Sequence, residues 1–150
     1  MKLPKLKEIP AGLFARMGSN GSFTGNSALG GGAVSIRSGC EATFDGTTFT
    51  SNTATVADGA ENNDGNGEGG GAIYVGYGTL TLQDVTMTGN EATDGFGGAI
   101  DAVKATVTIT GGEFSENTTG MAGGAIHAIE GSKVCANGTE FNGNEALNKN

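Results

Sequence analysis

The sequence predicts an all-β fold, a right-handed parallel β-helix (solenoid) of about five rungs. Two phrases that recur in step along the 150 residues indicate this fold. Gly-Gly-Ala followed by a β-branched residue occurs four times, at residues 31–34, 70–73, 97–100 and 123–126. An apolar residue three positions before an Asn occurs five times, as Phe23/Asn26, Phe49/Asn52, Met87/Asn90, Phe114/Asn117 and Phe141/Asn144. The Asn positions are separated by 26, 38, 27 and 27 residues, so one unit of about 27 residues repeats and one copy carries an insertion.

Each unit is predicted to consist of short strands, because the residues after each Gly-Gly alternate between apolar and polar with period two. The apolar pairs expected to face inward are Val34/Ile36, Ile73/Val75, Ile100/Ala102 and Ile126/Ala128. The polar residues between them, expected to face outward, are Ser35, Tyr74, Asp101 and His127. A second alternating run follows in each unit, and a third short strand leads into the Phe or Met. Two or three strands per unit, repeated at a fixed interval, make one rung of a parallel β-helix.

The repeated residues are predicted to form vertical columns, because stacked rungs lie about 4.8 Å apart. The Phe and Met column supplies the interior, where fully burying each side chain contributes about 1.5–3 kcal/mol. The Asn column lies at a turn, where amide side chains hydrogen-bond along the stack and Asn tolerates the left-handed backbone. Gly-Gly-Ala marks a corner at which a larger side chain would clash or φ must be positive.

The chain is expected to form one domain of two parts. Residues 1–22 lie outside the repeat and are expected to form a cap or a tail, and residues 23–150 form the repeat domain with an inserted loop at about 57–69. After the Phe141 to Asn144 phrase the last rung is expected to be open, so that further repeats or a partner chain cover it.

Charge excludes some classes of function. The formal net charge is −8, and residues 17–150 hold 15 acidic against 4 basic residues, a net charge of −11. Such a surface repels nucleic acid and suits solubility and basic partners. No apolar run approaches the roughly 20 residues that cross a membrane. Cys40 and Cys135 have different phases in the repeat and lie rungs apart, so we expect both to be free.

The inserted loop is the first candidate binding site. It carries four acidic residues, Asp58, Glu61, Asp64 and Glu68. A calcium loop of the helix-loop-helix type would start at Asn62, but its twelfth position is Ile73, where a bidentate Glu is required. We therefore predict no metal and no cofactor. Loops on one face of a solenoid often carry the binding surface, so partner contacts are expected here.

The outward column with Tyr74, Asp101 and His127 is the second candidate. Asp101 and His127 are expected to be vertical neighbours, close enough for an ion pair on an exposed strand. Polysaccharide lyases and hydrolases also use β-helices, but a glycosidase needs a second carboxylate, and none joins this column. We therefore predict no enzymatic activity. The rows Thr79/Thr81 and Thr106/Thr108 are similar to ice-binding arrays but stop after two rungs, which is ordinary strand preference.

The interleaved phrases between Phe23 and Asn144 resemble the repeat of polymorphic outer membrane proteins, the chlamydial autotransporter adhesins. The resemblance implies a cell-surface or secreted adhesion module on a right-handed β-helix, with a protein or glycan partner on its side face or loop. The alternative is an internal scaffold subunit that docks in a larger assembly through its open C-terminal rung or its basic N-terminal tail. The start at Met1 without a clear signal peptide favours that alternative.

Overall fold

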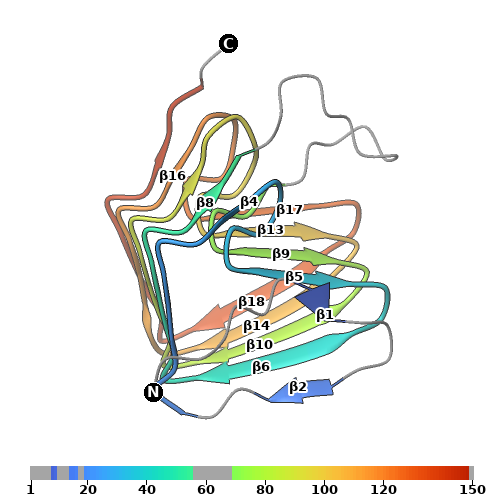
Figure 1. Cartoon of the computed structure of the whole chain (residues 1–150). Coiled ribbons are helices and arrows are strands. Elements are labelled where there is room, and N and C mark those ends of the chain that lie inside the picture. Colours follow the sequence, from blue (N-terminus) through green and yellow to red (C-terminus); the bar gives the residue numbers. More distant parts are fainter. Residues whose placement is uncertain (1–7, 10–13, 17–18, 56–68, 149–150) are drawn as a thin grey trace.

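The predicted all-β parallel solenoid is confirmed by a computed structural model (Figure 1). The structure describes residues 8–9, 14–16, 19–55 and 69–148, and these form strands and turns without a helix. The strands are β1 (Glu8–Ile9), β2 (Phe14–Arg16), β3 (Ser22–Thr24), β4 (Ser27–Ala28), β5 (Val34–Arg37), β6 (Glu41–Asp45), β7 (Thr48–Thr50), β8 (Thr53–Ala54), β9 (Ile73–Gly76), β10 (Thr79–Gln83), β11 (Thr86–Thr88), β12 (Glu91–Ala92), β13 (Ile100–Val103), β14 (Thr106–Thr110), β15 (Glu113–Ser115), β16 (Thr118–Thr119), β17 (Ile126–Ile129), β18 (Lys133–Asn137), β19 (Glu140–Asn142) and β20 (Glu145–Ala146).

The strands stack into four parallel sheets of five strands each, so the solenoid has five rungs. Each rung contributes one strand to each sheet: β1, β5, β9, β13 and β17 form the first sheet, and β2, β6, β10, β14 and β18 the second. The third sheet contains the strands with the Phe or Met, from β3 to β19, and the fourth contains the two-residue strands after each Asn, from β4 to β20. The sequence predicted two or three strands per rung; the fourth is too short to show an alternation.

The segment expected to lie outside the repeat supplies two strands of the first rung. β1 pairs with β5 in the register Glu8 to Ser35, and β2 pairs with β6 in the register Phe14 to Glu41. This segment contains neither the Gly-Gly-Ala phrase nor an Asn of the column, so its phase relative to the repeat is not visible in the sequence. The solenoid therefore begins before Phe23.

The interior is a continuous apolar column. Phe23 and Phe49 stack with ring centroids 4.8 Å apart, and Phe44 meets both rings edge-on. Met87 and Phe114 continue the column in register and are fully buried. Exposure changes abruptly at the last rung, where Phe141 stacks on Phe114 at 5.0 Å but is 46% exposed. The core thus extends through four rungs and is open at the fifth.

The five asparagines lie in one column beside this core. In each rung the backbone N–H and the Nδ2 of one Asn both donate to the Oδ1 of the Asn in the next rung, at 2.8–3.1 Å. From the second rung on, Nδ2 also donates to the carbonyl of the Phe or Met in the preceding rung, at 2.8–2.9 Å. Asn52, Asn90 and Asn117 are fully buried. Each of these side chains therefore joins three rungs.

The Gly-Gly-Ala corner needs both of its glycines. The first has a positive φ, +67° at Gly97, and a Cβ there would meet the carbonyl oxygen of Ile100. The second lies against the backbone of the fourth sheet: a Cβ on Gly98 would come within 2.7 Å of the Thr118 backbone nitrogen. Because backbone faces backbone at this point, no side chain fits.

The turn between the first and second sheets carries a left-handed residue other than glycine in each of the last four rungs. These residues are Ser38, Tyr77, Lys104 and Glu130, with φ between 49° and 57°. Lys104 Nζ lies 2.8 Å from the Glu130 carboxylate, donates to the Tyr77 hydroxyl at 3.2 Å and faces the Tyr77 ring. The hydrogen bond to Glu130, and after it the one to Tyr77, raises the pKa of Lys104, so this lysine stays charged.

The graded burial of the aromatic column gives a test of the stack. Phe114→Ala should lower the free energy of unfolding by about 3–5 kcal/mol, because it leaves a cavity between two rungs. Phe141→Ala is the matched control, the same change at the same phase, and should cost much less because its ring is already half exposed. Urea denaturation followed by circular dichroism measures both. Equal losses would contradict the assignment of inner and open rungs.

Candidate functional site

The outer column of the first sheet brings four predicted polar side chains into line. The register pairs Ser35 with Tyr74, Tyr74 with Asp101, and Asp101 with His127. The expected vertical order of this column is therefore present. The central strands that carry it, β9 and β13, are hydrogen-bonded on both sides, so the backbone positions are fixed by the stack.

The column is buried, which corrects the expectation of an exposed strand with a surface ion pair. Ser35 is 6% exposed, Tyr74 4% and Asp101 1%. The reason is that the chain before each Gly-Gly-Ala corner folds across the outer side of the first sheet and stacks on its own counterparts. Gly70 N–H donates to the Phe96 carbonyl, and Gly97 N–H donates to the Ala122 carbonyl. The covering segments thus form a ladder of their own.

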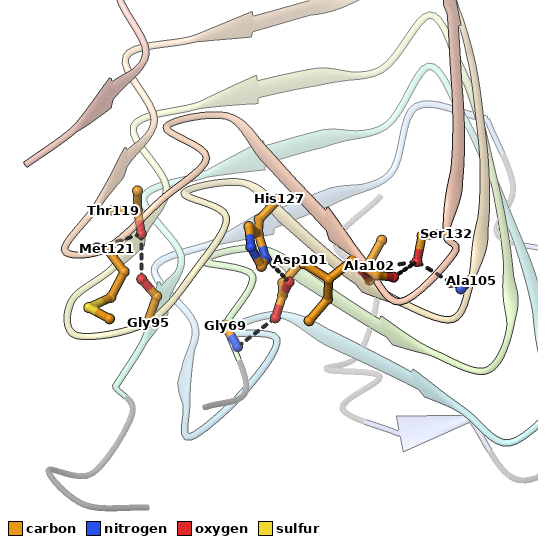
Figure 2. A network of polar contacts seen from close by, with 10 residues as sticks. Gly69, Gly95, Asp101, Ala102, Ala105, Thr119, Met121, His127 and Ser132 are labelled. Carbon is orange, nitrogen blue, oxygen red and sulfur yellow. Dashed lines mark hydrogen bonds and ion pairs between the residues drawn. The ribbon is translucent and has the colours of Figure 1, made fainter. Parts of the chain in front are cut away.

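Asp101 is the polar centre of this covered column (Figure 2). Its Oδ1 lies 2.9 Å from Nδ1 of His127, and its Oδ2 accepts a hydrogen bond from the backbone N–H of Gly69 at 3.1 Å. A buried carboxylate is retained at low cost only when both oxygens are paired in this way. Both oxygens of Asp101 are thus paired, by the rung that follows and by the segment that lies across it.

Phe96 is a member of the site that the sequence analysis missed. Its ring stacks on the His127 ring with centroids 4.5 Å apart and an interplanar angle of 22°. Phe96 occupies the position just before a Gly-Gly-Ala corner, where the other copies have Gly30, Gly69 and Ala122. That departure from small residues is the signal that could have identified it.

Thr119 fixes the segment that carries Phe96. Its Oγ1 donates to the Gly95 carbonyl at 2.6 Å and accepts from the Met121 N–H at 3.3 Å (Figure 2). The same hydroxyl is fully buried. Because two neighbouring covering segments share one hydroxyl, the Phe96 ring is held over His127 by the backbone and not by its own packing alone.

The other half of the column is built around an arginine. Arg37 Nε donates to Ser35 Oγ at 3.2 Å, and the Arg37 guanidinium lies 4.9 Å from the centroid of the Tyr74 ring. A cation over an aromatic face is stabilised by the ring quadrupole. The column therefore divides into a cationic half around Tyr74 and an anionic half around Asp101.

The acidic loop begins and ends at this column. Its four predicted binding residues, Asp58, Glu61, Asp64 and Glu68, lie outside the described residues. The residue that follows them, Gly69, is the one that donates to Asp101. The two candidate sites predicted from the sequence, which are far apart in the chain, therefore meet at Gly69.

The chemistry available in the described part of the chain is hydrogen bonding and ring stacking. Within residues 8–9, 14–16, 19–55 and 69–148, no group of three or more His, Cys, Asp or Glu side chains is placed to hold a metal ion. Cys40 is buried in the core and Cys135 is exposed on the second sheet, and both are free. Thr79 pairs with Thr106 and Thr81 with Thr108, and the rows pass to Lys133 and Cys135 in the last rung.

Comparison with known proteins identifies the repeat. Residues 46–76 match the family model of the Chlamydia polymorphic membrane protein repeat. The repeats are of the polymorphic membrane protein type. The matched residues run from the turn before β7 through the inserted loop to the end of β9, so the loop lies inside a family-type repeat. No curated protein and no solved structure matches the chain. Among the helices of the described ranges, none qualifies as a membrane span.

The pairing of Asp101 gives a second prediction. Asp101→Leu should lower the free energy of unfolding by about 1–3 kcal/mol, because it leaves the Gly69 N–H and the His127 ring nitrogen without a buried partner. Asp101→Asn keeps an acceptor oxygen and should cost less. Thermal and urea denaturation of the two variants measure the difference. Wild-type stability in Asp101→Leu would show that these contacts do not hold the covering segment.

Proposed function

We propose that the chain is a non-enzymatic, adhesin-like binding module of the cell surface or of a secreted protein, which holds a protein or glycan partner at its acidic loop. The observation that carries the proposal is the bond between Gly69 and Asp101, which attaches an acidic insertion within a family-type repeat to a buried column. Polymorphic membrane protein repeats occur in surface-exposed autotransporter adhesins, which supports this class of function.

Rigidity of the support favours a role in binding. A loop on a solenoid makes contacts at low entropic cost when both of its ends are fixed. At the first end, Thr55 N–H donates to the Ala28 carbonyl at 2.8 Å. At the second end, Gly69 donates to Asp101 and its carbonyl accepts from the Gly31 N–H at 2.9 Å. Three rungs thus hold the two ends of the loop.

Charge indicates the kind of partner. The insertion holds four acidic residues and no basic one, on a body that is itself acidic. A partner with a basic patch, or a glycan with hydrogen-bond donors, complements such a loop, whereas nucleic acid does not. Electrostatic attraction of this kind acts mainly on the rate of association and weakens with salt.

The site favours binding over catalysis. Glycoside hydrolysis uses two carboxyl groups about 5–10 Å apart. In the outer column the one carboxylate is Asp101, and both of its oxygens are already paired. Release of oligosaccharide from an acidic polysaccharide by the purified chain, lost in His127→Ala, would overturn this part of the proposal.

The proposal predicts loop-dependent binding. The labelled chain is applied to an array of glycans and an array of secreted and cell-surface proteins, beside a variant with Asp58→Asn, Glu61→Gln, Asp64→Asn and Glu68→Gln. We expect saturable binding that is weakened about tenfold or more in the variant, a loss of roughly 1.4 kcal/mol. The matched control neutralises four acids on other faces, namely Glu41, Asp45, Glu113 and Glu116.

Two outcomes would contradict the proposal. The first is an equal loss of binding in the loop variant and in the control variant, which would mean that net charge and not the loop is recognised. The second is a cell fractionation in which the protein is protected from added protease in an internal complex. That result would favour the scaffold alternative, for which the open rung at Phe141 is the supporting observation.

A further inference from the structure

The last rung presents an unfinished surface. Its strands β17, β18, β19 and β20 each pair on one side only, with β13, β14, β15 and β16. Val134, Phe141 and Leu147 are 38–46% exposed, whereas Val107 and Phe114 at the same phases are fully buried. An edge of four strands beside exposed apolar side chains is a template for further pairing.

The Asn column specifies what that surface needs. Asn144 Oδ1 accepts both bonds from Asn117, and Asn144 Nδ2 donates to the Phe114 carbonyl. In every earlier rung, the backbone N–H and a second Nδ2 hydrogen converge on the Oδ1 of the following Asn. At Asn144 these two donors meet no acceptor among the described residues. The open rung therefore calls for an amide oxygen at this point.

The first rung carries the complementary group. Asn26 donates to Asn52 through its backbone N–H and its Nδ2, and no described residue donates to Asn26 Oδ1. The strands β1, β2, β3 and β4 also pair on one side only. The solenoid thus has an acceptor end at Asn26 and a donor end at Asn144. Two C-terminal ends facing each other would oppose donors to donors, so the hydrogen-bond polarity favours stacking of unlike ends.

The distribution of charge agrees with the same arrangement. The first sixteen residues carry four basic residues and one acidic residue. The strands of the last rung carry three acidic residues and one basic residue, namely Glu130 in the turn after β17, Glu140, Glu145 and Lys133. Opposite net charges at the two ends steer unlike ends together and like ends apart.

We propose that the chain associates head to tail with a second copy of itself, the C-terminal rung of one copy stacking on the first rung of the next and continuing the Asn column from Asn144 to Asn26. Such a contact uses different surfaces on the two partners and does not close on itself, so it generates an open series of oligomers. Because Phe23 is only 2% exposed, the apolar surface covered in this contact is mainly that around Phe141.

Sedimentation velocity over a range of protein concentrations tests the proposal. We expect the mass of the full chain to rise with concentration through dimers to larger species, and to fall as salt is added. Phe141→Asp should remain monomeric. Tyr77→Asp is the matched control, since Tyr77 is also 46% exposed but lies on a side turn, and it should associate like the wild type. A wild-type chain that is monomeric at every concentration would overturn the proposal and assign the rung to another partner.

Mixing of two blocked copies tests the direction. Phe141→Asp blocks the donor end, and the triple variant Lys2→Glu, Lys5→Glu and Lys7→Glu reverses the charge of the other end. Each variant alone should be monomeric, and an equimolar mixture should form dimers and nothing larger, because one compatible pair of ends remains. Dimers of the lysine variant alone would indicate contact between two C-terminal ends and overturn the head-to-tail arrangement. A mixture that stays monomeric would overturn it as well. Circular dichroism of each variant shows that it remains folded.

Discussion

The hydrogen bonds between stacked asparagines set the register on which the rest of the structure depends. A parallel strand pair on its own permits a slip, and a slip of one residue moves every side chain to the opposite face. Each buried Asn bonds to the Asn of the next rung and to the Phe or Met carbonyl of the preceding one, so a slipped rung would leave buried amides unpaired. Unpaired buried polar groups are costly, which makes one register much more stable than the others.

The polar column is a consequence of that register. Once the rungs are aligned, the glycine corners stack as well, and the chain before each corner crosses the outer side of the first sheet. Asp101, Tyr74 and Ser35 are then enclosed between a sheet and a second layer of backbone. The same layer ends the acidic loop at Gly69 and holds Phe96 on His127. The loop is therefore joined to the core through one carboxylate, and a binding role follows from that connection.

Much of the fold was predictable because the repeat shows in the sequence at every level. Phrases such as Phe114/Asn117 fix the phase, and alternation fixes which side chains face inward. Alternation does not tell whether the outward side is covered, so the burial of Asp101 could not be foreseen from β13 alone. The covering depends on backbone that has no strand pattern of its own, apart from Phe96 at a position of small residues. The strands β1 and β2 were missed because their segment lacks both phrases.

Hydrogen exchange of the asparagine side-chain amides, followed by NMR at low protein concentration, tests the central claim most directly. Both Nδ2 protons of Asn52, Asn90 and Asn117 are hydrogen-bonded between rungs, so the account predicts slow exchange for all six. At Asn144 one proton is bonded to Phe114 and the other has no acceptor among the described residues, so one should exchange slowly and one rapidly. Rapid exchange of the amide protons of Asn52, Asn90 and Asn117, at the rate of an exposed Asn, would contradict the account.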